Sequence, residues 1–175
     1  MLNWEWAWWY DRRQSTQRMQ GNAYENSLNQ VGSVRTAREF FQYFNNMCDP
    51  GDMQPGTTMY FFRHDVKPMW EDPANGRGAS LTWRVTGPSK EVAKKWEMAL
   101  LALIGETILD TPSGEIVGIL FARRAKGDRI AIWIRDKSNA MTAANITLFF
   151  KNELMLGEPA YEPHPIADKK PSGRR

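Results

Sequence analysis

The apolar residues of this chain follow two different periods, and the order in which these periods occur limits the possible architectures. Three segments repeat apolar residues every three or four positions, which predicts amphipathic helices: one from Thr36 to the stop at 49–51, one over 89–105 and one over 138–156. Five others alternate apolar with other residues or form short β-branched and aromatic runs, as strands do: 4–10, 58–63, 80–86, 116–123 and 129–135.

This order predicts an α+β domain with a largely antiparallel sheet. The strands 116–123 and 129–135 are separated by AKGD, a turn sequence that favours a hairpin. The sequence has no regular strand–helix–strand alternation, no Gly-rich phosphate loop and no internal repeat, so a doubly wound parallel sheet is not expected. We therefore expect three helices to cover one face of the sheet and to leave the other, concave face free.

The ends of the helices carry local signals. Thr36 and Glu39 have the spacing of a capping box, in which each side chain accepts a hydrogen bond from the other residue's backbone. Ser89 is a candidate N-cap for the second helix. Residues 11–30 are polar, and we expect them to form a loop.

Length and composition indicate one domain followed by a tail. The 175 residues are enough for one well-packed core, and no run of about 18 apolar residues predicts a membrane span. From Gly157 onwards the chain has four prolines and a basic end. We therefore expect one domain over 1–156 and a loop or disordered tail over 157–175. The single Cys48 fits a reducing compartment such as the cytoplasm or the nucleus.

Residues 67–78, KPMWEDPANGRG, place a tryptophan directly before two acidic residues in a turn-rich segment. Trp70 offers a large π face and Glu71 a carboxylate that only accepts hydrogen bonds, a pair that suits a ligand site. Asp72 stands before a proline and favours a turn. A net charge of +3 does not by itself indicate a nucleic-acid partner, so on this evidence alone a structural loop and a ligand site are about equally expected.

Three segments together resemble the messenger-RNA cap-binding family of eukaryotic translation initiation factor 4E. They are 67–78, WEMALLALIGE at 96–106 and RAKGDRIAIW at 124–133, and their order and spacing agree with the family. The resemblance covers most of residues 4–156. It implies a curved antiparallel sheet, with three helices packed on its convex face and a cap-binding slot on its concave side. It also implies a binding protein that is no enzyme and needs no metal or cofactor.

The resemblance implies how the slot holds the base. The 7-methylguanine of a cap is cationic, so two flanking aromatic rings contribute stacking of about 1–3 kcal/mol and a cation–π attraction of about 0.5–2 kcal/mol. Trp70 is implied as one ring, and Tyr24 as the other, where the family ordinarily has tryptophan. Glu71 is implied to accept from the base N1–H and amine, and Trp133 to contact the added methyl group.

The resemblance further implies a basic pair for the cap's triphosphate. Arg124 and Lys126 lie two residues apart on an extended segment that enters a turn, so we expect their side chains to point the same way. Ser80 and Ala122 stand where the family usually has arginine and asparagine. These two differences reduce the polar contacts expected around the cap.

A second surface is implied on the first two predicted helices. Partners of the family, a scaffold initiation factor of the 4G type or a 4E-binding repressor, dock there as a short amphipathic helix. The large aromatic residue is phenylalanine here instead of tryptophan, so we expect an altered partner set. We expect the chain to be monomeric apart from this partner and capped mRNA. The implied residues of this surface are Ala37, Phe41, Glu97, Met98 and Leu101.

Three alternatives stay open at this point. A family member can repress or store messages instead of recruiting ribosomes. A glycoside hydrolase would use Glu71 and Asp72 as its carboxylate pair, although adjacent residues on an extended chain point in opposite directions. A carbohydrate-binding module would also use aromatic platforms, but it would need neither Glu71 nor the basic pair. Competition by 7-methyl-GTP but not by a sugar separates the last alternative from cap binding.

Overall fold

The computed structural model describes residues 1–12 and 22–165 of the chain. The helices are Asn22–Glu25 (α1), Ala37–Phe44 (α2), Ser89–Ile104 (α3) and Ala140–Glu153 (α4). The strands are Trp6–Arg12 (β1), Asn29–Val34 (β2), Thr57–Arg63 (β3), Ala79–Val85 (β4), Ile116–Ala122 (β5), Asp128–Ile134 (β6) and Ala160–Pro163 (β7). No helix in these two ranges is long and apolar enough to cross a membrane.

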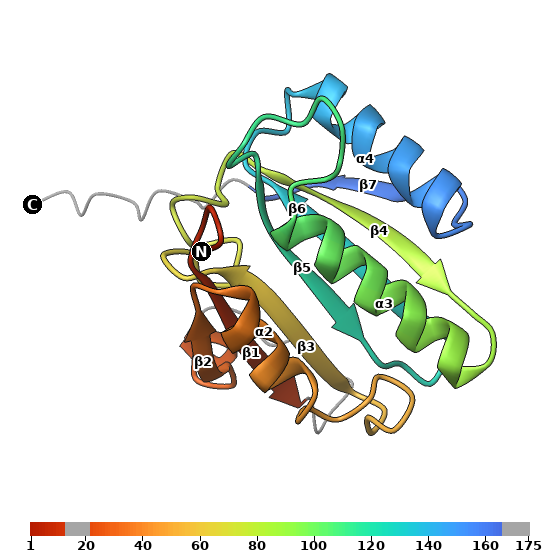
Figure 1. Cartoon of the computed structure of the whole chain (residues 1–175). Coiled ribbons are helices and arrows are strands. Elements are labelled where there is room, and N and C mark those ends of the chain that lie inside the picture. The colour runs from red at the N-terminus through yellow and green to blue at the C-terminus, as the bar shows by residue number, and fades with distance from the viewer. Residues whose placement is uncertain (13–21, 166–175) are drawn as a thin grey trace, which may run out of the picture.

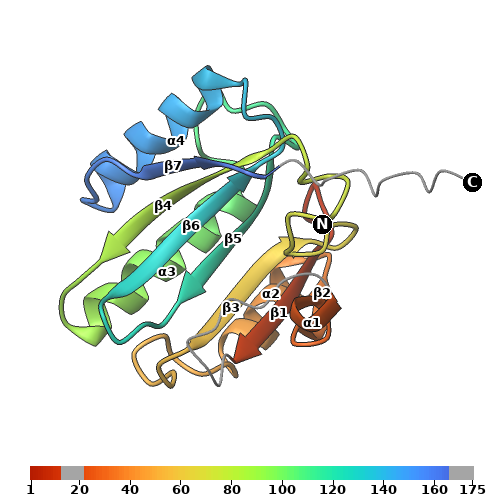
Figure 2. The same cartoon turned by 180° about the vertical axis from the view of Figure 1, so that it is seen from behind.

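The strands of the described residues form one seven-stranded sheet in the order β2-β1-β3-β5-β6-β4-β7, and every neighbouring pair is antiparallel. Strands β5 and β6 form the expected hairpin, whose turn contains Gly127 with a φ of 113°, a conformation that glycine adopts without strain. Helices α2, α3 and α4 cover one face of the sheet (Figure 1), and the opposite face is uncovered by them (Figure 2). The expected α+β class and antiparallel sheet are confirmed.

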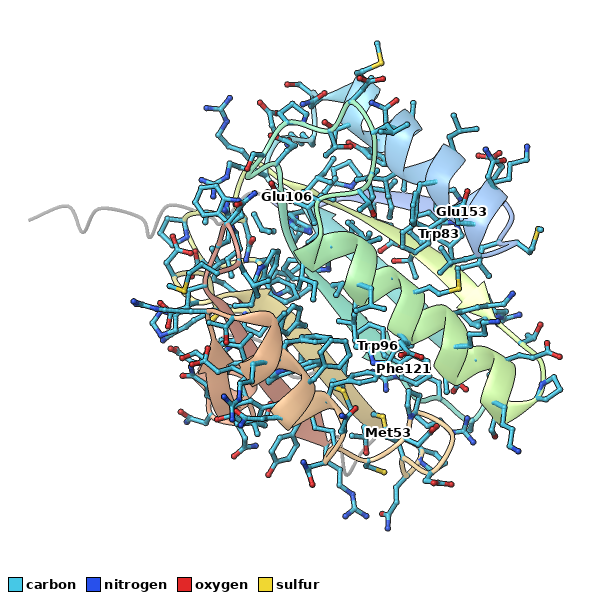
Figure 3. All side chains as sticks on the ribbon, viewed as in Figure 1. Met53, Trp83, Trp96, Glu106, Phe121 and Glu153 are labelled. Carbon is cyan, nitrogen blue, oxygen red and sulfur yellow. The ribbon has the colours of Figure 1, made fainter. Side chains whose placement is uncertain are left out.

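The main core lies between the sheet and these three helices. Trp96 of α3 packs against Phe121 of β5, with ring centroids 5.8 Å apart, and Figure 3 shows both labelled beside α3. Trp83 of β4 stacks on Phe150 of α4 at 4.2 Å. Each buried aromatic side chain removes about 150–250 Å² from water, so such pairs contribute strongly to stability. Helical spacing predicts an apolar stripe on α3, and its members Val92, Trp96, Ala99, Leu100 and Leu103 are buried, whereas Ile104 at the end of the helix is partly buried.

Local signals explain where the helices begin. The Glu39 backbone N–H donates to Thr36 Oγ1 and the Thr36 N–H donates to Glu39 Oε2, both at 3.1 Å, so the predicted capping box is confirmed. The prediction that Ser89 caps α3 was wrong, because Ser89 is already the first helical residue and Pro88 precedes it without a side-chain cap. Helix α4 begins after Asn139, whose side chain accepts from the Thr142 N–H.

The two edge strands were not predicted. The segment 11–30, expected as loop, contains α1 and the start of β2, and its residues 13–21 lie outside the described part. The tail 157–175 was expected to be loop or disorder, but residues 160–163 form β7 and pair with β4. Edge strands are held by ladder hydrogen bonds on one side only, and all four side chains of β7 are exposed. Apolar alternation, the signal of a half-buried strand, is therefore absent from β7.

Candidate functional site

A cavity of about 710 Å³ lies on the face of the sheet that the helices leave uncovered. Its floor is built by small side chains of β4, β5 and β6. Successive residues of a strand point to opposite faces, so these side chains face away from the helical core. The loop 64–78 and α1 contribute to one wall, and β7 with the residues that follow it contributes to another. The floor residues are Ser80, Thr82, Ala122 and Ala131.

One end of the cavity is aromatic. Trp133 of β6 lines it and packs edge-on against Phe62 of β3, with centroids 5.3 Å apart and planes at 79°. Trp70 lines it from the loop 64–78, and both indoles are half-buried. His164, just after β7, lies against Trp133 with ring centroids 4.3 Å apart. His164 belongs to the segment expected to be a tail, and no signal in the sequence indicated its place here.

The loop that carries Trp70 is a set of tight turns. Asp72 makes the predicted turn, since its carboxylate accepts from the backbone N–H groups of Lys67 at 3.0 Å and Ala74 at 2.9 Å. Glu71 follows Trp70 directly and is exposed. Its side chain is not among the described residues that line the cavity.

Tyr24 of α1 lines the cavity, but its side chain is only 8% exposed. Its hydroxyl oxygen lies 2.9 Å from the Tyr60 hydroxyl and 3.1 Å from the Pro68 carbonyl oxygen. The Tyr60 hydroxyl in turn donates to Asp11 Oδ2 at 3.1 Å. Burial raises the pKa of Tyr60 well above its usual value, and the neighbouring Tyr24 and Asp11 add to this. These contacts tie α1 to β3 and to the residues just before Trp70.

The opposite end of the cavity is basic. Arg124 is half-buried, and its guanidinium donates to the carbonyl oxygens of Thr57 and Arg123 and to the Thr58 hydroxyl at 2.8–2.9 Å. Arg129 of β6 is exposed and also lines the cavity. Ala122 pairs with Thr58 on one side and with Arg129 on the other. Thr58, Ala122 and Arg129 thus form one row across β3, β5 and β6. The Arg124 guanidinium lies at the Thr58 end of this row and Arg129 lies at the other end.

The predicted pair of Arg124 and Lys126 is not brought together in the cavity. Lys126 is exposed in the turn between β5 and β6 and is not among the described lining residues. Strand alternation does not extend into a turn, so a spacing of two residues did not place both side chains on one face. Arg129, which sequence reasoning missed, lies four residues before Trp133, and an even spacing on a strand indicates a shared face.

The second predicted surface lies on the helical side of the sheet. Phe41 of α2 is 39% exposed and packs edge-on against the buried Phe40. A groove of about 510 Å³ lies between the end of α2 and the first half of α3, and Glu97 lines it. All five residues of the predicted surface lie on α2 or α3, and none is buried: Ala37, Phe41, Glu97, Met98 and Leu101.

Fold and cavity together define an α+β protein with a cavity, aromatic at one end and basic at the other, on the open face of an antiparallel sheet. A model of the eukaryotic initiation factor 4E family matches residues 1–175. The chain therefore belongs to the eukaryotic initiation factor 4E family, as the resemblance predicted. This membership also confirms that the chain is not an enzyme and excludes the glycoside hydrolase alternative.

Relatives in yeasts and plants agree with this assignment. Eukaryotic translation initiation factor 4E of Candida glabrata is 30% identical over 174 residues, which cover 98% of this chain and 81% of that relative. Eukaryotic translation initiation factor 4E-1 of Arabidopsis thaliana is 33% identical over 145 residues, which cover 83% of this chain and 59% of that relative. The chain thus spans less than two thirds of the length of the plant relative.

Solved structures of nematode proteins share the fold. Ascaris suum eIF4E-3, solved with an m7G cap, superposes with a TM-score of 0.83 at 28% identity, covering 98% of this chain and 94% of that one. Caenorhabditis elegans eIF4E-3, solved with the 4E-binding protein Mextli and a cap analog, superposes with a TM-score of 0.82 at 26% identity. This second match covers 93% of this chain and 91% of that one.

Proposed function

We propose that the chain binds the 7-methylguanosine 5′ cap of mRNA in the cavity of the open sheet face. The observation that carries this proposal is the polarity of the cavity. Arg129 and Trp133 lie four residues apart on β6, which corresponds to about 13 Å along a strand. A cap joins a cationic base to an anionic triphosphate through a ribose, so its two ends match the aromatic and the basic end of the cavity.

At the aromatic end, the base stacks between Trp70 and Tyr24, and its methyl group faces Trp133. The support is that all three rings line the cavity. A cationic base gains from each flanking ring both stacking and cation–π attraction. Glu71 is exposed beside Trp70, so its carboxylate can rotate towards the N1–H and amine of the base. The Ascaris suum relative was solved with an m7G cap, which agrees with this use of the fold.

At the basic end, Arg124 and Arg129 bind the triphosphate. Thr57 and Thr58 hold the Arg124 guanidinium in place, so little conformational entropy is lost when it meets a phosphate. Arginine matches phosphate oxygens with two parallel hydrogen bonds. Lys126 is exposed at the neighbouring turn and adds positive charge near the phosphates instead of a direct contact inside the cavity.

Bound to a cap, the chain recruits mRNA to translation initiation in the cytoplasm and also in the nucleus, through a partner on its helical face. The partner is a scaffold factor of the 4G type or a 4E-binding repressor, whose amphipathic helix docks on the α2 and α3 residues named above. The Caenorhabditis elegans relative was solved with a 4E-binding protein. A role in repressing or storing messages is the second candidate. Co-purification from extract with and without cap analogue identifies the partner and separates the two roles.

The test of cap binding is a calorimetric titration of the purified chain with 7-methyl-GTP and with GTP. The wild type should prefer the methylated, cationic form. Trp70→Ala should lose about 1–3 kcal/mol of binding free energy, the range for one stacked base. Phe41→Ala is a matched control, because it removes an exposed aromatic ring on the opposite, helical face. Equal affinity for both nucleotides in the wild type, or an unchanged preference in Trp70→Ala, would contradict the proposal.

A further inference from the structure

The loop that carries Trp70 is organised around one buried side chain. Asn75 is fully buried, and its Nδ2 donates to the carbonyl oxygens of Lys67 at 2.9 Å and Met69 at 2.8 Å. These two carbonyl groups belong to the backbone immediately before Trp70. The position of the indole relative to the sheet therefore depends on where Asn75 is held.

Asn75 is held from outside the loop by the segment after β7. Its carbonyl oxygen accepts from the Gly78 N–H at 2.9 Å and lies 2.8 Å from His164 Nδ1. The His164 backbone N–H donates to the Gly78 carbonyl at 3.0 Å. A Cβ atom at Gly78 would lie 2.3 Å from the Ile134 carbonyl oxygen and 3.1 Å from His164 Nδ1, so only glycine permits this close approach.

The same imidazole packs against the second indole of the cavity. The His164 and Trp133 ring centroids are 4.3 Å apart, with planes at 55°, and His164 is 5% exposed. Because a carbonyl oxygen can only accept, Nδ1 must carry the proton. In the neutral ring Nε2 is then unprotonated, and it is buried with no hydrogen-bond partner among the described residues.

We propose that His164 is a positioning residue of the cap site: its neutral, Nδ1-protonated ring holds the Trp70 loop, through Asn75, at a fixed distance from Trp133. His164 thus acts on the ligand through the two indoles. The ligand named here rests on the proposed function, whereas the dependence of the loop on His164 does not.

Protonation of His164 works against this arrangement. The loop presents the Asn75 carbonyl to the ring, β6 presents Trp133, and the charged group that acts on it among the described residues is Lys137 beyond β6. Burial lowers the pKa of His164, the Asn75 carbonyl partly offsets this, and Lys137 lowers it further. A second proton would create a buried N–H without an acceptor and would place a cation near a cationic base.

The sign of the pH effect follows from this direction. An unfolded histidine titrates near pH 6.5, whereas the pKa of folded His164 lies lower. Stability should therefore fall as the pH drops through about 6.5 and should stop falling below the folded pKa, since both states are then protonated. Cap affinity should fall only below the lower, folded pKa, because binding starts from the folded state.

Two substitutions separate the hydrogen bond from the ring. His164→Phe keeps an aromatic ring against Trp133 and removes the donor to Asn75. His164→Asn keeps an amide donor near the position of Nδ1 and removes the ring. His64→Phe is the matched control, because the His64 side chain is 48% exposed and lies next to Glu5, away from the cavity.

We would measure amide hydrogen exchange of residues 67–78 in the ligand-free chain, together with the dissociation constant for 7-methyl-GTP between pH 5 and 8. A neutral hydrogen bond contributes about 0.5–1.5 kcal/mol, so His164→Phe should speed exchange and weaken binding by about 2- to 13-fold. His164→Asn should retain slow exchange, and both variants should lose the acid-side fall in affinity that the His64→Phe control keeps.

The outcomes test the positioning role of His164 and the proposed cap binding separately. Exchange rates and affinity of His164→Phe that match those of the wild type would overturn the positioning role. If His164→Phe does not fold, His164→Asn and the wild type are compared instead. Identical pH dependence of the dissociation constant in these two proteins would overturn the positioning role. If the wild type does not bind 7-methyl-GTP at all, the proposed function fails, and the exchange of the ligand-free loop still decides the role of His164.

Discussion

Substitutions of Tyr24 test the least conventional part of the proposed site, because a tyrosine ring there must both stack on the ligand and anchor α1. Two hydroxyl protons, those of Tyr24 and Tyr60, serve three contacts: the contact between the two hydroxyls, Tyr24 to the Pro68 carbonyl and Tyr60 to Asp11. Because the Tyr60 hydroxyl donates its proton to Asp11, the Tyr24 hydroxyl is the donor to both the Tyr60 oxygen and the Pro68 carbonyl oxygen. Two buried acceptors therefore depend on the Tyr24 hydroxyl.

Tyr24→Phe removes this donor and keeps the ring. Leaving a buried acceptor unsatisfied costs about 1–3 kcal/mol of unfolding free energy. For a domain of this size each kcal/mol corresponds to about 2–4 °C in Tm, so thermal unfolding should occur about 2–12 °C lower. Cap affinity should change much less, because the π face is retained. Tyr24→Trp also loses the hydroxyl, so we expect no gain in affinity from its larger ring.

Tyr24→Ala removes the ring as well, and calorimetry should then show a further loss of about 1–3 kcal/mol in binding 7-methyl-GTP. The decisive quantity is the ratio of the affinities for 7-methyl-GTP and GTP, since only a ring that faces the base alters it. An unchanged ratio in Tyr24→Ala, together with a lower Tm, would refute the stacking role and leave Tyr24 as an anchor of α1 alone. An unchanged Tm in Tyr24→Phe would refute the anchoring role.

Two further predictions concern charge. Cap affinity should fall from the triphosphate to the monophosphate to the nucleoside. Arg124→Ala and Arg129→Ala should each make this decrease smaller, whereas Lys126→Ala should keep most of the decrease and mainly reduce the salt dependence of binding. A calorimetric series in which Lys126→Ala has the largest effect would reverse this assignment. Burial, with Tyr24 and Asp11, raises the pKa of Tyr60, so its neutral form is favoured by folding and stability should be lost as the pH rises above about 10. Tyr60→Phe should lack this alkaline loss in denaturant titrations at pH 9–11.

Much of the fold could be predicted because its signals are local or periodic. The segment 58–63 is a short run rich in aromatic residues and is buried in β3, and α3 buries most of the stripe that its helical spacing indicated. The capping box at Thr36 depends on two residues three positions apart, so neighbouring residues alone define it. Ser89 had the right residue type for a cap, but Pro88 precedes the helix and Ser89 already belongs to it.

The candidate site was only partly predictable. Spacing along the chain predicts which face a side chain points to inside a strand, but not in the turn that follows the strand. Trp70 and Trp133 were predicted by motif and both line the cavity. Lys126 was paired with Arg124 on the assumption of a continuing strand, but it lies in the turn, and Arg129 occupies the cavity instead. The even spacing from Arg129 to Trp133 was a usable signal for a shared face.

By itself the sequence determined the α+β class, the hairpin of β5 and β6, the buried helical stripes and the family, since each is written in short-range periodicity or in motifs of adjacent residues. Only the tertiary structure revealed the features that depend on pairing between distant segments of the chain. Strand β7 exists because its backbone hydrogen-bonds with β4, about 80 positions away along the chain, while its side chains remain exposed. That pairing brings His164 to Asn75 and Trp133, a contact that no local pattern encodes because it forms only when the last strand joins the sheet.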